Sequence, residues 1–554
     1  MNLIVSEDKK ELEFILERLQ NKFHNYHVLP FSLDVLIYCK LNNLNFINPL
    51  NYINNQFHKN ILISSKELLD NLNYGSIETE SQKKEYKNYI RKKYFQIYFT
   101  YNLISLVSKS KDVKKIFVSG WTNNIKYYFI SNIVKEYFSN FIEIIEKNKE
   151  NKISILNNHY EFSLTKFNSE KKKKILFTGQ EYNLLRLIIV ARLIKLSVYV
   201  ISEKKNFNIL NNLMKCIGVK YLHFEKSKKI EIKDFKLDNI NFSYLGVNFS
   251  NLLNKSIKYI NSKLTDTYFK SKALENILKL KKIDLVVSVI ARGYQGSAID
   301  FSKLYGVKTL GVSHGTISKS FDEYDKVYKE TIAEGVYNKN YDYFPIQTNI
   351  TFESAKNFAF PDLKLKTGNL IFAENNLSLR KKNKILYAVT NKNFNQMQFL
   401  GVELYFEFYK NLEILNKLGE DRNFEIIVNL HPSVDDFSFK NLKKLFKNLE
   451  FTKEKISTCL KKTFVTISFS STVIEDSISS NIPVILFDNW KRYKHCDSEE
   501  DIENKSQPIY YVSNEKKLKK CIINIKQNRK VNFQEFKYGS NCFVNIYKLF
   551  KKIL

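Results

Sequence analysis

Polar side chains that suit phosphate binding follow two apolar runs near the end of the chain, Ile426–Leu430 and Phe464–Phe469. Both runs are short, rich in β-branched or aromatic residues and bounded by polar residues, as expected of buried parallel strands. The first is followed by His431 and Pro432, and the second by three hydroxyl residues, Ser470, Ser471 and Thr472. Ligands of an open parallel sheet bind beyond the carboxyl ends of its strands, and free N–H groups at a helix start favour an anion there. The two stretches therefore predict a phosphate site that uses no glycine-rich loop.

Each stretch also has a purely structural explanation. Thr472 and Glu475 have the spacing of a capping box, in which the hydroxyl and the carboxylate only satisfy the first N–H groups of a helix. His431 before a proline is also compatible with an ordinary loop histidine. The order of the two stretches on consecutive βα units, followed by Asn481-Ile482-Pro483-Val484-Ile485, favours a binding site.

Alternating strands and helices are expected to position these residues. The expected strands are Asn2–Val5, Val113–Ser119, Lys174–Thr178, Val198–Ser202, Ile283–Ile290, Val307–Val312, Leu365–Thr367, Lys384–Val389, Val484–Phe487 and Tyr510–Val512. The expected helices are Lys83–Lys109, Thr122–Phe138, Glu181–Leu196, Gly296–Tyr305, Met397–Leu418, a spacer between the two apolar runs, and most of Lys516–Leu554 with a break near Gly539. The tyrosine and phenylalanine stripe of Lys83–Lys109 is interpreted as core, and Asp322–Phe344 as a long functional loop.

This alternation predicts an α/β protein with two Rossmann-like domains and the active site in the cleft between them. Residues 1–345 are expected to form the N-terminal Rossmann-like domain, which binds the acceptor and whose first 170 residues are less regular. Residues 346–554 are expected to form the C-terminal Rossmann-like domain, which binds the nucleotide donor and ends in a helical tail. The 554-residue length agrees with more than one core.

Composition narrows the classes of partner and location. The formal net charge is +31, but the lysines are spread over the whole chain beside many Asn and Ile residues, so a nucleic-acid partner is not expected. Peripheral contact with an anionic inner-membrane surface is favoured instead. Six widely spaced cysteines without a C-x-x-C pattern, the lack of a signal-peptide pattern and the charges within Leu184–Leu196 indicate a cytoplasmic protein without a membrane span.

Three motifs resemble those of GT-B transferases that build bacterial surface polymers: CDP-glycerol glycerophosphotransferases, capsule polymerases, and polysialyl- and Kdo-type transferases. Ser313-His314-Gly315-Thr316 resembles the H-G-T element of the glycerophosphotransferases, and His431-Pro432 the HP motif of CMP-activated sugar transferases. Ser470-Ser471-Thr472 with Glu475 and Asp476 resembles the paired-serine motif that holds donor phosphate. The motifs lie in the second half of the chain, and Ala333-Glu334-Gly335 only partly matches the acidic motif that supplies a base in polysialyltransferases.

The resemblance implies a glycosyltransferase that moves a sugar from a nucleotide-activated donor, CMP- or CDP-type, to a growing glycan or lipid-linked acceptor. Ser470, Ser471, Thr472, His431 and Pro432 would hold the donor phosphate, and Glu475 or Asp476 would bind the ribose or base. His314 at a strand end is the preferred general base because its ordinary pKa of about 6.5 suits that role. Other candidate bases are Asp322, Glu323 and Glu334. Residues expected on the acceptor side are Gly179, Gln180, Arg292, Gly315 and Thr316. Trp121 could stack on a sugar, and Arg492 and His495 could close a loop on the donor side.

No cofactor is expected. No metal is expected either, because Asp435-Asp436 suits a solvated loop better than a metal pair, and the helix dipole and His431 would replace the metal. Three other functions remain open. One is phosphoryl transfer from a CDP-glycerol-like donor, and another is a non-hydrolysing sugar-nucleotide epimerase, for which the chain is longer than expected. The third is a non-catalytic scaffold of a surface-polymer assembly complex.

Overall fold

The structure is a computed structural model of the whole chain. It describes all residues except 20–25, 120–129, 145–159, 163–171, 180–183, 203–208, 227–233, 281–282, 314, 318–319, 321, 359–364, 375–382, 389–402, 422, 433, 470, 492–494, 497, 499, 501, 504–506, 528–530 and 540.

The middle lobe is built on a five-stranded parallel sheet of order β13-β12-β6-β7-β8. Its strands are β6 (Lys174–Phe177), β7 (Ser197–Ser202), β8 (Lys220–His223), β12 (Leu285–Ser288) and β13 (Lys308–Gly311). Almost every residue of these strands is buried, as expected when helices cover both faces of a parallel sheet. Helices α6 (Leu185–Leu193) and α7 (Ile209–Cys216) pack on one face, and α8 (Ser250–Leu280) and α9 (Gly293–Leu304) on the other.

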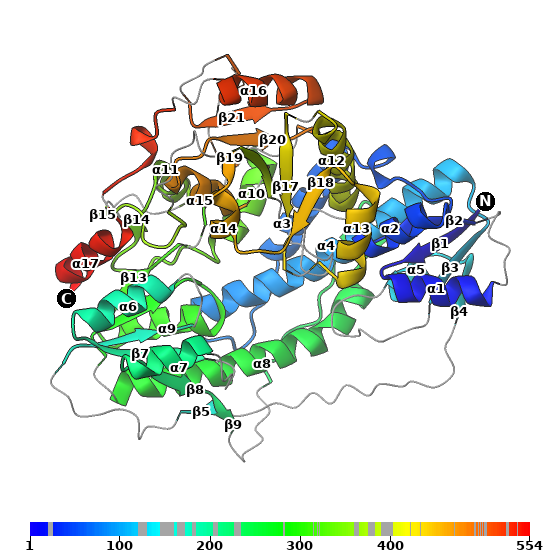
Figure 1. The fold of residues 1–554 in the computed structure, drawn as a ribbon. Coiled ribbons are helices and arrows are strands. Elements are labelled where there is room, and N and C mark those ends of the chain that lie inside the picture. The colour runs from blue at the N-terminus through cyan, green and yellow to red at the C-terminus, as the bar shows by residue number, and fades with distance from the viewer. Residues whose placement is uncertain are drawn as a thin grey trace.

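The C-terminal lobe contains a six-stranded parallel sheet of order β18-β17-β16-β19-β20-β21. Its strands are β16 (Lys384–Ala388), β17 (Glu425–Asn429), β18 (Leu449–Thr452), β19 (Thr463–Ser468), β20 (Val484–Phe487) and β21 (Ile509–Val512). The intervening helices are α12 (Glu403–Gly419), α13 (Asp436–Leu445), α14 (Ile456–Leu460), α15 (Val473–Ser479) and α16 (Glu515–Gln527). The predicted α/β class with two Rossmann-like domains is therefore confirmed (Figure 1).

A third parallel sheet occupies the part of the chain that was expected to be less regular. It has the order β2-β1-β3-β4, from β1 (Asn2–Ser6), β2 (Tyr26–Pro30), β3 (Lys115–Ser119) and β4 (Phe141–Ile144). Helices α1 (Lys9–Arg18), α2 (Leu33–Leu41), α3 (Asn55–Asp70) and α5 (Ile130–Tyr137) accompany it. The prediction missed β2 and β4, because β2 contains His27 and Pro30 and β4 is only four residues long. Whether residues 1–345 form one domain stays a prediction.

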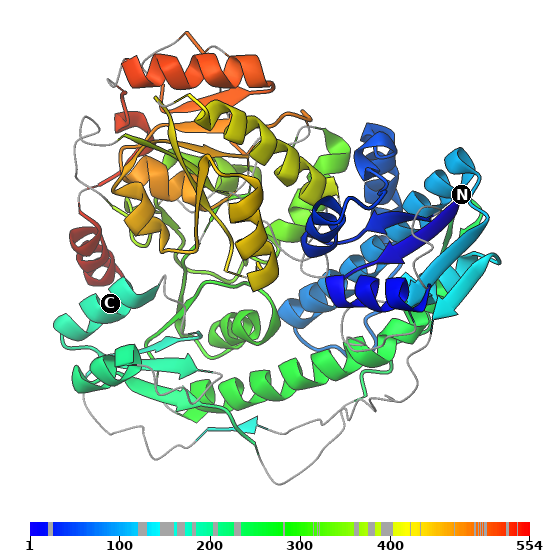
Figure 2. The same ribbon diagram turned by 45° about the vertical axis from the view of Figure 1, so that its right-hand side comes forward.

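Two long helices connect this third sheet to the middle lobe, α4 (Glu80–Lys111) and α8 (Figures 1 and 2). Thr79 caps α4 by accepting a hydrogen bond from the Gln82 N–H, and Asp112 ends it in the left-handed conformation. The aromatic stripe of α4 is core, as interpreted: Tyr86, Tyr94 and Phe99 are almost completely buried. Helix α4 thus fixes the third sheet to α8 and α9 of the middle lobe.

Two predicted connections are wrong. The segment Asp322–Phe344 is not a long irregular loop, since α10 (Glu323–Ala333) occupies its first half. Asp322 caps this helix by accepting from the Asp325 N–H, a signal that the dense charges of the segment concealed. The spacer between the two apolar runs is not purely helical either, because β18 lies between α13 and α14. The two phosphate-site stretches are therefore not on consecutive βα units.

The end of the chain returns to the middle lobe. Helix α17 (Cys542–Ile553) lies beside α6 (Figures 1 and 2), and Ile546, Leu549, Phe550 and Ile553 join the hydrophobic cluster that covers one face of the middle sheet. The expected break near Gly539 is present, since Gly539 has a φ of +70° between α16 and α17. Within the described residues, the structure has no helix that is long and apolar enough to cross a membrane.

Candidate functional site at the contact between the two lobes

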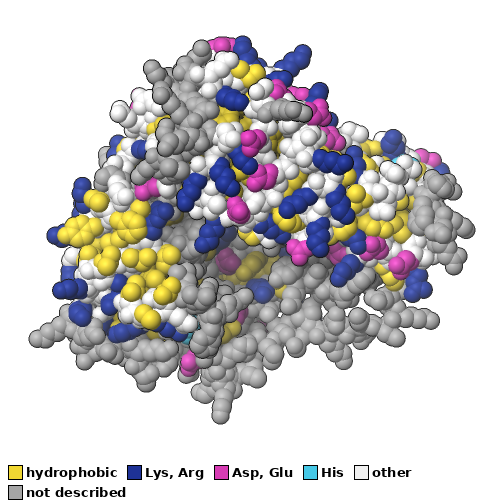
Figure 3. Space-filling view, viewed as in Figure 1, with side chains coloured by type: hydrophobic (Ala, Val, Ile, Leu, Met, Phe, Trp, Pro, Cys, Tyr) yellow, Lys and Arg dark blue, Asp and Glu magenta, His cyan; other side chains and the backbone are white. Residues whose placement is uncertain are grey.

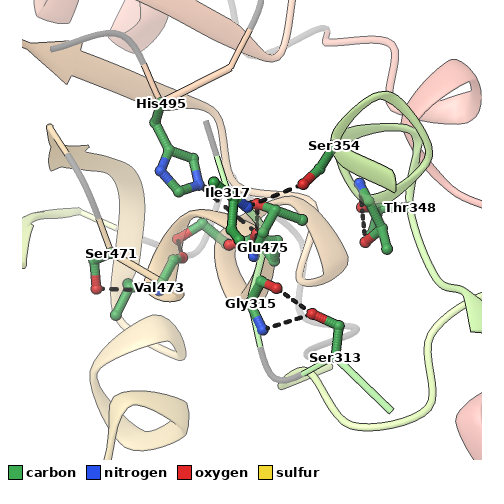
Figure 4. A network of polar contacts seen from close by, with 12 residues as sticks. Ser313, Gly315, Ile317, Thr348, Ser354, Ser471, Val473, Glu475 and His495 are labelled. Carbon is green, nitrogen blue, oxygen red and sulfur yellow. Dashed lines mark hydrogen bonds and ion pairs between the residues drawn. The ribbon is translucent and has the colours of Figure 1, made fainter. Parts of the chain in front are cut away.

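The two hydroxyl-bearing motifs meet where the middle and C-terminal lobes touch (Figure 4). Gly315 and Thr316 follow β13, and Thr472 and Glu475 begin α15 after β19. A Cβ added at Gly315 would lie 2.6 Å from Thr472 Cγ2, so only glycine allows this approach. Because both sheets are parallel, these residues extend from the carboxyl ends of their strands, where ligands of such sheets bind.

Glu475 is the centre of this contact. Its side chain is fully buried, and Oε1 accepts a hydrogen bond from the Thr316 N–H at 3.1 Å and another from the Thr316 hydroxyl. His495 is also buried, with Nε2 3.2 Å from Thr316 Oγ1 and 3.7 Å from Glu475 Oε1. In the described part of the chain, Glu475 Oε2 and His495 Nδ1 have no hydrogen-bond partner. The sequence predicted that Glu475 binds ribose, which in this arrangement would require the lobes to separate.

Asp476 faces a different part of the junction. Its Oδ1 accepts a hydrogen bond from the Ala373 N–H at 2.6 Å, and burial raises the pKa of Asp476 to about 7. The nearby charge of Glu475 contributes to this rise, while the Ala373 N–H and Arg186 oppose it. Ala373 makes a second hydrogen bond to α15 and its C-terminal end, since the Ser480 hydroxyl donates to the Ala373 carbonyl at 3.0 Å. A carboxyl with a pKa near neutrality can exchange a proton at physiological pH.

The connection between the lobes is itself hydrogen-bonded to the first motif. Gln347 Nε2 donates to the Ser313 carbonyl at 2.9 Å, and Gln347 Oε1 accepts from the Leu370 N–H at 3.0 Å. The Ile317 N–H donates to Ser354 Oγ at 3.0 Å, and Tyr337 OH lies 2.6 Å from the same hydroxyl. This network holds Ser313 and Ile317 near helix α11 (Asn349–Asn357). Sequence reasoning missed Gln347, Ser354 and Tyr337, because they belong to no motif.

The predicted phosphate residues lie at one edge of the C-terminal sheet. His431 follows β17 and is half-buried, Pro432 is exposed, and Ser471 and Thr472 follow β19. Strands β17 and β19 flank β16, so their carboxyl ends are separated by two strand spacings, roughly 10 Å. The proposed capping box is not formed: Thr472 makes no side-chain cap, while Ser471 Oγ accepts from the Val473 N–H at 3.3 Å. Ser470 lies outside the described residues.

Of the predicted acceptor-side residues, Gly179 and Arg292 lie at strand ends of the middle sheet. A Cβ at Gly179 would lie 3.1 Å from Gln295 Nε2, so the strand end approaches α9 closely. Arg292 Nε forms an ion pair with Glu85 Oε2 on α4 at 3.5 Å, and Glu334 pairs with Lys87 of α4 at 3.7 Å. The Ala291 N–H donates to the Gly335 carbonyl at 2.9 Å, which brings these two ion pairs together. The aromatic stripe of α4 predicts a core helix, and nothing in its spacing indicates these ion pairs.

Several predicted residues have structural roles or cannot be placed. Asp322 caps α10, and Asp435 caps α13 by accepting from the Ser438 N–H at 2.8 Å. Asp435 is therefore an N-cap and not simply part of a solvated loop. Glu323 is the exposed first residue of α10. His314, Gln180, Trp121 and Arg492 lie outside the described residues. No group of three or more His, Cys, Asp or Glu residues that could hold a metal occurs in the described ranges.

Comparisons with known proteins found structural likeness but no family assignment. No family model matches the chain. No curated protein matches it in sequence either.

Among solved structures, the chain is similar to a putative UDP-N-acetylglucosamine 2-epimerase from Listeria monocytogenes, with 10% identity over 69% of this chain and 95% of that one, and a TM-score of 0.42. It is also similar to S. aureus MnaA with UDP, with 13% identity, 69% and 98% coverage and a TM-score of 0.42. A third is the Neisseria meningitidis UDP-GlcNAc 2-epimerase bound to UDP-GlcNAc, with 12% identity, 69% and 99% coverage and a TM-score of 0.42.

Proposed function

We propose that this protein is a glycosyltransferase that moves a sugar from a nucleotide-activated donor, CMP- or CDP-type, to a growing surface glycan or a lipid-linked acceptor. The observation that carries the proposal is the contact of Gly315 and Thr316 with Thr472 and Glu475. It joins the strand-end motifs of two parallel sheets, the region in which such folds bind ligands. Nucleotide and sugar would lie beside this contact.

The C-terminal lobe supplies the groups for the leaving nucleotide. Ser470, Ser471, Thr472 and His431 donate to the donor phosphate, and Pro432 orients the loop. As the bond between the sugar C1 and the phosphate oxygen breaks, its electron pair moves to the phosphate, and donors directed at that charge lower the barrier. One such donor is worth about 3 kcal/mol. Asp476 and Glu475 are proposed to accept from the ribose hydroxyls once the lobes separate.

The middle lobe supplies the groups for the acceptor. His314 takes the proton of the acceptor hydroxyl while the hydroxyl oxygen forms the new bond to the sugar C1. Glu334 is the alternative base. Arg292, Gly179, Gln180 and Thr316 line the acceptor side. The helix start and His431 replace a metal in this mechanism, so we predict that EDTA leaves turnover intact. Loss of turnover in EDTA with recovery in Mn²⁺ or Mg²⁺ would contradict this prediction.

Thermal-shift measurements of the full chain with CMP, CDP, UDP and GDP test the proposal. A nucleotide at 100 times its Kd stabilises the native state by about 2.7 kcal/mol, and CMP or CDP should raise Tm most. His431→Ala should lose most of this shift, measured relative to its own Tm without nucleotide. His58→Ala on α3, in the first part of the chain, is the matched control and should keep this shift.

The outcomes separate the remaining alternatives. Stabilisation by none of the four nucleotides would count heavily against a nucleotide-donor enzyme and favour the scaffold. A glycerol-phosphate product from CDP-glycerol would indicate phosphoryl transfer. Conversion of UDP-GlcNAc to its 2-epimer without any acceptor would indicate an epimerase and refute the transferase.

A further inference from the structure

Exposed hydrophobic side chains gather on one side of the middle lobe. Of the eleven large hydrophobic residues that are exposed in the described part of the chain, six belong to α6, α7 and the residue following it, and α17. These six are Leu193, Leu213, Ile217, Phe543, Val544 and Tyr547. Leu193 is 72% exposed and Leu213 is 60% exposed, values that leave most of each side chain in water. Burial of such a surface against a partner would be favourable.

The helices that carry these residues are neighbours, because they share one hydrophobic cluster. Ala191 of α6, Met214 of α7 and Leu549 of α17 all pack against the same face of the middle sheet. Arg192 Nε donates to the Ile217 carbonyl at 2.8 Å, which joins the end of α6 to the end of α7. Figure 3 shows hydrophobic side chains beside lysine and arginine side chains where α17 and α6 lie. We call this the α6–α7–α17 surface.

The charged residues of this surface have a single sign. Residues 184–196, 209–220 and 541–554 contain no Asp or Glu. They contribute five exposed lysines, Lys195, Lys215, Lys548, Lys551 and Lys552. On α17, the buried residues face the lobe, whereas Phe543, Tyr547 and the three lysines point outward. An outer face that carries aromatic rings and lysines together suits contact with the headgroup region of an anionic membrane, where the rings are partly buried and the lysines contact lipid charges.

We propose that the α6–α7–α17 surface docks the protein onto an anionic lipid membrane, with Phe543 and Tyr547 entering the headgroup region and the lysines contacting lipid phosphates. Charge complementarity selects this partner. A second copy of the chain docked through the same surface would bring lysines against lysines, an arrangement that costs several kcal/mol for direct juxtapositions. The proposal is independent of the transferase function and of the site at the lobe contact.

Co-sedimentation of the full chain with vesicles tests the proposal. We expect binding to vesicles of phosphatidylcholine with phosphatidylglycerol, weak binding to phosphatidylcholine alone, and weaker binding at high salt because charges are screened. Each lysine near an anionic surface contributes about fivefold, so Lys548→Glu, Lys551→Glu and Lys552→Glu together should lower the partition coefficient at least ~100-fold. Phe543→Ser with Tyr547→Ser should also weaken binding, at unchanged net charge.

The matched control is Lys440→Glu, Lys443→Glu and Lys444→Glu together, at three exposed positions of α13. It changes the net charge by the same amount as the α17 triple variant. It should lower the partition coefficient far less than the α17 variant. Equal loss in both triple variants would overturn the proposal, because net charge alone would then explain binding. So would absence of binding to phosphatidylglycerol vesicles, or a dimer in analytical ultracentrifugation that Phe543→Ser with Tyr547→Ser abolishes. Unchanged Tm and circular dichroism would establish that each variant is folded.

Discussion

The contact between Gly315 and Thr472 can be tested by one added methyl group. In Gly315→Ala, the new Cβ would lie 2.6 Å from Thr472 Cγ2, whereas carbon atoms prefer separations of about 3.5–4.0 Å. The backbone of Gly315 itself permits alanine, because its φ is outside the positive region that favours glycine. The clash between the two lobes is therefore the only cost, and such overpacking is typically worth about 1–3 kcal/mol.

The companion change, Thr472→Ser, removes the methyl group that the new Cβ in Gly315→Ala would meet and keeps the hydroxyl. Thr472 is exposed, so this change alone should affect stability by less than about 0.5 kcal/mol. In the double variant, most of the stability lost in Gly315→Ala should return. The pair thus forms a double-mutant cycle with an expected coupling of about 1–3 kcal/mol.

Thermal unfolding followed by fluorescence measures the cycle. For domains of 150–250 residues a loss of 1 kcal/mol lowers Tm by about 2–4 °C, so Gly315→Ala should lower Tm by several degrees. A Tm unchanged by Gly315→Ala would show that Thr472 does not pack closely against Gly315. An equal loss in the Thr472→Ser background would place the cause elsewhere. Either result would refute the contact on which the proposed site depends.

Three further predictions concern stability. Glu475→Ala removes the buried carboxylate that accepts from the half-buried Thr316 N–H and should cost about 1–3 kcal/mol, seen as a lower Tm, whereas Glu420→Ala at an exposed position should have almost no effect. Because the pKa of Asp476 is raised in the folded protein, its protonated form stabilises the fold at pH values below the pKa of the unfolded chain, and this stabilisation is lost as the pH rises through about 7. The Tm of Asp476→Asn relative to the unmodified protein should therefore increase between about pH 5 and about pH 8. A difference in Tm that stays constant with pH would contradict this prediction. Phe550→Ala on the buried face of α17 should cost about 3–5 kcal/mol, while Phe543→Ala on its outer face should leave Tm nearly unchanged; equal losses would refute the orientation of α17.

The sequence alone determined the periodic elements of the two larger lobes. Runs such as Val484–Phe487 are apolar throughout because helices cover both faces of a parallel sheet, and the structure has this strand with the same bounds. Helix α4 and its aromatic core were equally predictable from spacing. Strands β2 and β4 were not predictable, because their own residues indicate a strand only weakly. They are stabilised by pairing with β1 and β3.

The contacts of the motif residues depend on how the two lobes pack against each other. Thr472 and Glu475 have capping-box spacing, yet Glu475 reaches Thr316 in the other lobe, 159 positions earlier in the chain. Likewise, Glu334 and Arg292 form ion pairs with Lys87 and Glu85 of α4, a helix whose sequence indicated only core. Local spacing specifies periodicity and turns, but a hydrogen bond between lobes depends on how whole sheets pack, and no short pattern records that.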